Sequence, residues 1–161
     1  NFKKMNRKRI FLILLMVFSL LLTSCSGAVS LYERCSDSQR KILDSEELPQ
    51  MLIYNRNYGY GAQYEVEDKE LITAALDALR QIQIESEYDM ACTDRDESIV
   101  FVTGDGERCV FYFNDGNFSL AEDKYIYRIS NAETLWNITS RIIQEYPDML
   151  AENSIDEEYE S

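Results

Sequence analysis

Two stretches of the chain place apolar residues at the spacing of an amphipathic helix. The first follows Asp68, a candidate N-cap, and the second follows Ser130 and Glu133, which are spaced as a capping box, and ends at Pro147. The apolar positions of the first are Leu71, Ile72, Ala75, Leu76, Leu79 and Ile82, and those of the second are Leu135, Trp136, Thr139, Ile142, Ile143 and Tyr146. One face of each helix is therefore expected to pack on a core.

Short apolar runs between and before these helices are typical of strands. The expected strands are residues 51–54, 98–103, 107–113 and 125–129 and one that includes Phe118 and Leu120, with 62–66 as a further candidate. Gly104-Asp105-Gly106 and Asn114-Asp115-Gly116-Asn117 are the turn signals that join consecutive strands. The acidic segment 85–97 lacks a clear period and is interpreted as a loop, with at most a short strand at 88–91.

Turn geometry predicts the register of the meander. A two-residue loop at Asp115-Gly116 places Phe113 opposite Phe118, and the same reasoning at the preceding turn places Val102 opposite Cys109. The resulting core wall comprises Val100, Val102, Cys109, Phe111, Phe113, Phe118 and Leu120. The predicted fold is α+β, an antiparallel β-meander of about four to five strands packed on one face by two amphipathic helices.

The first 24 residues have the organisation of an export signal. Residues 1–9 carry five basic and no acidic side chains, and residues 10–22 are apolar except for Ser19. As a helix this run would span only about 20 Å of a hydrocarbon core that is ~30 Å thick. A cleaved signal peptide therefore fits better than a permanent transmembrane helix.

The signal ends in Leu22-Thr23-Ser24-Cys25, which resembles the lipobox of bacterial lipoproteins. The resemblance implies cleavage before Cys25, a diacylglycerol group on the Cys25 thiol, and fatty acylation of the new amino terminus. The protein is then expected to be held by lipid on the extracytoplasmic face of a membrane, because two or three acyl chains anchor stably. The alternative is an ordinary secretory signal with a cysteine near its cleavage site.

Composition divides the rest of the chain into three parts. Residues 25–48 are polar and are interpreted as a lipidated cysteine and a tether, with a short helix at 38–44; residues 49–147 form one small domain, and 148–161 an acidic, disordered tail. All 29 acidic residues follow Cys25 while five of the 16 basic ones precede it, which leaves a formal charge of −18 after cleavage. That charge excludes a nucleic-acid partner. The domain resembles small lipoprotein domains of unknown function.

The chain offers little conventional catalytic chemistry. It contains no histidine, and the three cysteines that follow Cys25 include no C-x-x-C pair. If a disulfide forms, Cys92 with Cys109 is the favoured pair, although Cys109 is more simply a buried thiol. Neither Gly59-x-Gly61 nor Gly104-x-Gly106 opens a helix as a phosphate loop requires, so both are interpreted as turns. No cofactor and no metal site are predicted.

Tyrosines cluster around the first turn of the domain. Tyr54, Arg56, Tyr58, Tyr60 and Tyr64 surround two glycines, and such a loop suits recognition of a protein, a peptide or a cell-wall glycan; the alternative is a tyrosine-rich hairpin that packs on its own sheet. The leading hypothesis is a non-enzymatic binding or sensory module that binds through its sheet face or this loop. The competing one is a small envelope hydrolase that uses carboxylates of residues 85–97.

Overall fold

A computed structural model describes residues 29–57, 61–89, 96–120 and 125–151. The described strands form one sheet of eight strands, in the order β1-β4-β8-β7-β6-β5-β2-β3, with every neighbouring pair antiparallel. Their bounds are β1 Val29–Ser30, β2 Met51–Arg56, β3 Ala62–Val66, β4 Gln83–Asp89, β5 Glu97–Val102, β6 Arg108–Asn114, β7 Asn117–Ser119 and β8 Tyr125–Ser130. The α+β class is confirmed, whereas the prediction of four to five strands is wrong.

The sheet is wider than predicted because two strands are hidden in polar sequence. β4 covers residues 85–89 of the segment that is interpreted as a loop from the sequence, and it pairs with β8 on one side and with β1 on the other. Among the side chains of β4 that the structure describes, only that of Ile84 is buried. The sequence therefore lacks the alternation of apolar and polar positions that would predict a strand. The pairing also shifts between Ile84 and Ser86, which interrupts the period further.

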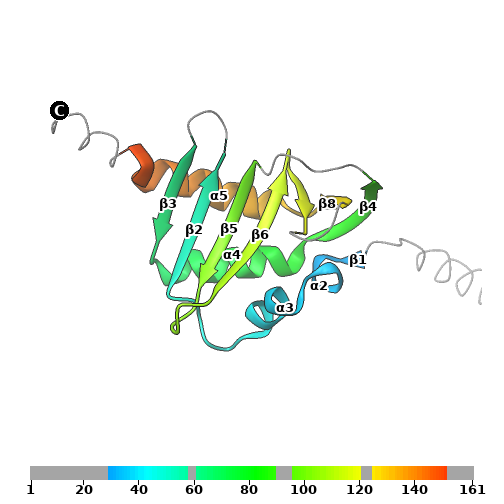
Figure 1. The fold of residues 1–161 in the computed structure, drawn as a ribbon, viewed down its shortest axis with the longest axis horizontal. Coiled ribbons are helices and arrows are strands. Elements are labelled where there is room, and N and C mark those ends of the chain that lie inside the picture. The colour runs from blue at the N-terminus through cyan, green and yellow to red at the C-terminus, as the bar shows by residue number, and fades with distance from the viewer. Residues whose placement is uncertain (1–28, 58–60, 90–95, 121–124, 152–161) are drawn as a thin grey trace, which may run out of the picture.

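The two predicted helices are α4, Lys69–Gln81, and α5, Glu133–Glu145, and both lie behind the sheet in Figure 1. Asp68 caps α4 as expected, since its carboxylate accepts from the amides of Glu70 at 2.8 Å and Leu71 at 3.3 Å. The predicted capping box of α5 is wrong: the N-cap is Ala132, without a side-chain bond. Asn131 has a left-handed φ of 58°, which turns the chain between β8 and the helix.

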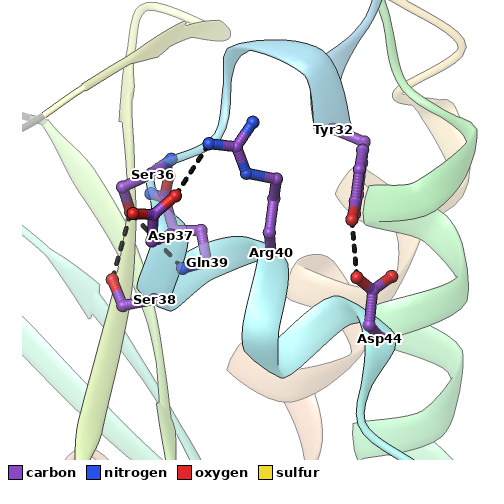
Figure 2. A network of polar contacts seen from close by, with 7 residues as sticks. All are labelled: Tyr32, Ser36, Asp37, Ser38, Gln39, Arg40 and Asp44. Atoms are coloured by element: carbon purple, nitrogen blue, oxygen red, sulfur yellow. Dashed lines mark hydrogen bonds and ion pairs between the residues drawn. The ribbon is translucent and has the colours of Figure 1, made fainter.

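The segment expected to be a tether is largely part of the folded domain. β1 pairs with β4, and two short helices follow, α2 at Leu31–Arg34 and α3 at Asp37–Asp44. Ser36 caps α3 in a capping box with Gln39, and Arg40 pairs with Asp37 at 2.9 Å (Figure 2). Leu31, Cys35, Ile42 and Leu43 are buried in the same core as α4 and α5. These few apolar residues are enough to pack the two short helices on the core. The mixed polar composition of the segment gave no indication of this packing.

The two hairpin registers had different outcomes. Phe113 lies opposite Phe118, as predicted, and Asp115 and Gly116 both have positive φ, as a two-residue type I′ turn requires. At the preceding turn, Cys109 lies opposite Phe101 instead of Val102. The reason is a three-residue loop, Gly104-Asp105-Gly106, in which the amide of Gly106 donates to the carbonyl of Thr103 at 3.0 Å and Gly106 has φ 85°.

The shift by one residue exchanges the two faces of β5. Ile99 and Phe101 now point into the core with Phe111, whereas Val100 is buried but belongs to the opposite face of the sheet. The predicted wall is therefore wrong for Val100 and Val102, and is confirmed for Cys109, Phe111, Phe113 and Phe118. Leu120 is only partly buried against that core.

The expected tail begins with ordered contacts. The carboxylate of Asp148 accepts hydrogen bonds at 3.0 Å from the amides of Gln63 and Leu150, which ties the chain after α5 to the edge strand β3. Residues 152–161 of the predicted tail, and all of the predicted signal peptide, lie outside the described residues. Within the described part of the chain, no helix is both long and apolar enough to cross a membrane.

Candidate functional site

The tyrosine cluster divides between the core and the part of the chain that is not described. Tyr54 and Tyr64 are directly paired on β2 and β3, are 2% and 7% exposed, and stack with ring centroids 6.1 Å apart. These two residues therefore pack on their own sheet, which is the alternative considered for the cluster. Tyr58 and Tyr60 lie outside the described residues, and Arg56, at the end of β2, is half-buried.

Arg56 lies in the last row of side chains on the helix-covered face. The pairing places it opposite Glu97 of β5, which in turn lies opposite Phe113 of β6. Core residues occupy the preceding row, with Tyr54 opposite Ile99. The sheet thus changes from apolar to charged at the edge where α5 crosses it, which leaves room for a polar cleft rather than a continuation of the core.

A cleft of about 420 Å³ lies at this edge, between α5 and the ends of β2, β5 and β6. It is lined by Tyr54, Arg56, Glu97, Asp115, Gly116, Trp136, Thr139, Ser140 and Ile143. Two residues of the predicted binding set, Tyr54 and Arg56, therefore meet residues far along the chain. Tyr64 is not among the lining residues, and Tyr58 and Tyr60 lie outside the described residues.

Tyr54 forms the floor of the cleft, and its surroundings keep its hydroxyl protonated. Burial raises the pKa of the Tyr54 hydroxyl, and the negative charge of Glu97 and a hydrogen bond to Glu97 raise it further. Arg56 and a hydrogen bond to Thr139 act in the opposite direction. Tyr54 is therefore a neutral hydrogen-bonding group over the whole physiological range and a poor candidate for a general base.

The wall of the cleft comes from α5 and was missed by sequence reasoning. The Trp136 ring meets the ring of Phe113 edge to face, with centroids 5.2 Å apart and an interplanar angle of 83°. Thr139, which is buried, donates its hydroxyl to the carbonyl of Trp136 at 3.1 Å. Because Trp136 belongs to the apolar stripe of its helix, its position in the sequence suggested a core role. The pairing of β2 with β5 places Arg56 opposite Glu97, and Trp136 lines the same cleft as these two residues.

The β6–β7 turn supplies the rim. Asp115 is exposed, and its amide donates to the carboxylate of Asp96 at 3.1 Å, which attaches the turn to the start of β5. The carbonyl of Asp96 accepts from the amide of Asn57 at 2.7 Å. The cleft thus carries two carboxylates, Glu97 and Asp115, against one guanidinium, and its charge has the same sign as the formal charge of −13 of the whole chain.

Among the described residues, the carboxylates proposed for a hydrolase do not converge. Glu87 lies on β4, near Arg34 at 3.9 Å, whereas Glu97 lies on β5, and three strands separate β4 from β5 in the sheet. Residues 90–95 lie outside the described residues. Among the described residues, no group of three or more acidic, cysteine or histidine side chains is placed to hold a metal ion.

A second cleft, of about 360 Å³, lies between α3 and the β5–β6 turn. The ammonium of Lys41 lies 3.1 Å from the carboxylate of Glu107 at its wall, and both side chains are largely exposed. Thr103 donates to Asp105 in the turn, and this bond lowers the pKa of the Asp105 carboxyl. These polar groups are occupied with one another, so this cleft offers less to a ligand than the one beside Trp136.

No protein-family model, no curated protein and no solved structure matches this chain. The function of the chain is therefore inferred from its own residues. The cleft beside α5 combines an aromatic wall, a neutral phenol and charges of both signs, which is the composition of a site for a polar ligand with an apolar part.

Proposed function

We propose that this protein is a lipid-anchored lipoprotein of the bacterial cell envelope whose domain is a non-enzymatic binding module. The order of basic residues, apolar run and Leu22-Thr23-Ser24-Cys25 supports the anchor. The single observation that supports binding is the cleft in which Trp136 and Tyr54 meet Arg56 and Glu97. The palmitoyl or related chains on Cys25 would hold this cleft on the extracytoplasmic side of the membrane.

The negative charge of the protein and of the cleft indicates which class of ligand would bind. The mature chain has a formal charge of −18, and the cleft has two carboxylates against one guanidinium. Such a surface attracts positive groups and repels acidic partners. We therefore assign the cleft to a peptide segment that carries positive charge and an apolar side chain able to pack on Trp136.

The protein has one tryptophan, and it lines the cleft, so its fluorescence reports directly on binding there. Two synthetic peptides of equal length, one rich in lysine and one rich in glutamate, each with one leucine, are titrated into the full chain in mild detergent. We expect a saturable change in Trp136 emission with the lysine-rich peptide alone. A response to soluble cell-wall glycan fragments instead would overturn the peptide assignment, and no response to either would overturn binding at this cleft.

Two variants with the same change of charge separate local from general electrostatics. Glu97→Gln removes a carboxylate inside the cleft, whereas Glu107→Gln removes one at the far turn. We expect Glu97→Gln to weaken binding about two- to fivefold, as loss of a partly exposed charge does. Glu107→Gln should leave the affinity within experimental error, and equal effects of both would indicate nonspecific attraction by net charge.

A further inference from the structure

Cys35 and Cys109 come from distant parts of the chain and are buried in one core. Cys35 separates α2 from α3 and is 4% exposed, and Cys109 lies on β6 and is 6% exposed. Both are free thiols in this structure, and both belong to the apolar cluster that unites the helices with the sheet. The sequence favoured Cys92 as the partner of Cys109, but Cys92 lies outside the described residues.

One side chain fixes the segment of Cys35 beside the strand of Cys109. The amide oxygen of Gln39 accepts from the backbone N–H of Ser36 at 2.9 Å, and its amide nitrogen donates to the carbonyl of Val110 at 2.7 Å. Gln39 therefore bridges the residue directly after Cys35 and the residue directly after Cys109. Gln39 is itself 4% exposed, and Figure 2 shows the hydrogen bond that its backbone amide donates to the Ser36 hydroxyl at the N-cap of α3.

The electrostatics agree with this proximity. Burial raises the pKa of the Cys35 thiol to about 12, and the neighbouring Cys109 is the next contribution in the same direction. Burial also raises the pKa of Cys109 to about 11. Each thiol therefore stays protonated at neutral pH once the protein has folded.

We propose that Cys35 and Cys109 form a disulfide bond when the exported chain folds. A thiolate of one cysteine attacks a disulfide supplied by a thiol–disulfide oxidoreductase, or by oxidised glutathione in vitro, and releases one thiol of the oxidant. The second cysteine then attacks the mixed disulfide and releases the other thiol. Two protons and two electrons pass from the protein to the oxidant, which is thereby reduced.

The location of the two residues predicts when the bond forms and what it does. In the unfolded chain the thiols are accessible and ionise more easily, whereas in the folded protein they are buried and protonated, so oxidation accompanies folding and is slow afterwards. The bond closes a loop of about 75 residues and attaches α2 and α3 to β6. In the cell the bond depends on the envelope location proposed above; in vitro it does not.

Peptide mapping tests the proposal. The full chain carrying Cys25→Ser is unfolded with reductant in denaturant, refolded in mild detergent with a glutathione redox buffer, alkylated and digested with trypsin. Cleavage after Arg34, Arg40, Arg108 and Lys124 separates Cys35 and Cys109 from Cys92, which lies on its own fragment. We expect one linked species, residues 35–40 joined to residues 109–124, in most of the protein.

The outcomes of the mapping, and the melting temperatures of refolded variants, test the pairing. A link between Cys92 and Cys109, or alkylation of both Cys35 and Cys109 after refolding, overturns the proposal. Protein refolded with oxidant should melt about 10 °C higher than the same protein refolded with reductant. Cys35→Ala with Cys109→Ala should abolish that difference, whereas Cys92→Ala should leave it intact; the reverse pattern contradicts the pairing. Failure of peptide binding at the Trp136 cleft would not affect any of these readouts.

Discussion

The ring of Tyr54 stacks on the ring of Tyr64 across the β2–β3 hairpin, with centroids 6.1 Å apart and planes 23° from parallel. Both rings belong to the apolar core, and the hydroxyl of Tyr54 reaches Glu97 at the floor of the cleft. Tyr54 thus connects the stability of the domain with the site at its edge. Substitutions there affect both, and the two effects must be separated.

Tyr54→Phe and Tyr54→Ala separate the ring from the hydroxyl. Loss of the buried ring in Tyr54→Ala should lower the free energy of unfolding by about 3–5 kcal/mol, because a cavity remains under α5. Tyr54→Phe keeps the ring and loses the hydrogen bonds of the hydroxyl to Glu97 and Thr139, so the expected loss is about 1–2 kcal/mol. Urea denaturation followed by circular dichroism measures both, and equal losses would indicate that the ring does not pack.

The shifted register of β5 and β6 makes a second prediction. Phe101 is fully buried in the core, whereas Val102 is only partly buried and lies on the other face. Phe101→Ala should therefore cost about 3–5 kcal/mol of unfolding free energy, and Val102→Ala less than about 1 kcal/mol. In the register that a two-residue turn imposes, Val102 would lie in the core, so a large loss in Val102→Ala would contradict the observed pairing.

The packing of the segment before β2 makes a third prediction. Leu31 has no exposed surface, and the neighbouring Glu33 is exposed. Leu31→Ala should lower the free energy of unfolding by about 2–5 kcal/mol, and Glu33→Ala by less than about 0.5 kcal/mol. The same denaturation experiment measures both variants. If the segment were only a tether, Leu31→Ala would have no more effect than its control.

Local signals in the sequence were sufficient to predict the elements that have a regular apolar period or characteristic turn residues. Leu71, Leu76 and Leu79 define the buried face of α4, and Asp115-Gly116 defines the type I′ turn with its register. Antiparallel pairing of β5, β6, β7 and β8 in chain order follows from short turns. These features depend on residues close together in the chain, so they can be predicted from the sequence alone.

The parts that could not be predicted depend on distant partners. β4 is polar and becomes a strand because β8 offers it a ladder, while α2 and α3 pack because α4 and β6 leave apolar surface for Leu31 and Ile42. The cleft needs the pairing of β2 with β5, which brings Arg56 to Glu97 and both beneath Trp136. Composition around Tyr54 indicated a binding loop but could not show that its ring is buried.

Alkaline pH should destabilise the thiol form of the protein. Burial raises the pKa of Cys109 to about 11 and that of Cys35 to about 12, from 9.0 for an exposed thiol. Between pH 9 and the raised pKa values, the unfolded chain has lost thiol protons that the folded protein retains. The contribution of the two protonated thiols to stability is therefore complete below pH 9 and is lost as the pH rises through 11 to 12. Urea denaturation in the presence of reductant should show the free energy of unfolding falling above about pH 9.

The double variant Cys35→Ala with Cys109→Ala is the control for this pH dependence. Its free energy of unfolding should begin to fall only above about pH 10, where an ordinary tyrosine ionises but the buried Tyr54 does not, since the pKa of Tyr54 is also raised by burial. The oxidised protein should behave in the same way, because a disulfide has no proton to lose. Identical curves for the thiol form and the double variant would contradict the role of the two thiols.

The proposed lipid anchor gives the last prediction, because under this proposal it determines on which side of the membrane the domain lies. Cys25→Ser removes the thiol that the lipobox resemblance identifies as the site of diacylglycerol attachment. We expect loss of labelling by a radioactive or clickable fatty acid, and accumulation of a precursor that retains the basic and apolar residues before Ser24, since the peptidase of this class acts on the lipidated cysteine. Cys92→Ser, a thiol change elsewhere, should be labelled and processed normally. Normal processing of Cys25→Ser would instead indicate an ordinary secretory signal, and the domain, with its formal charge of −18, would then be released from the membrane.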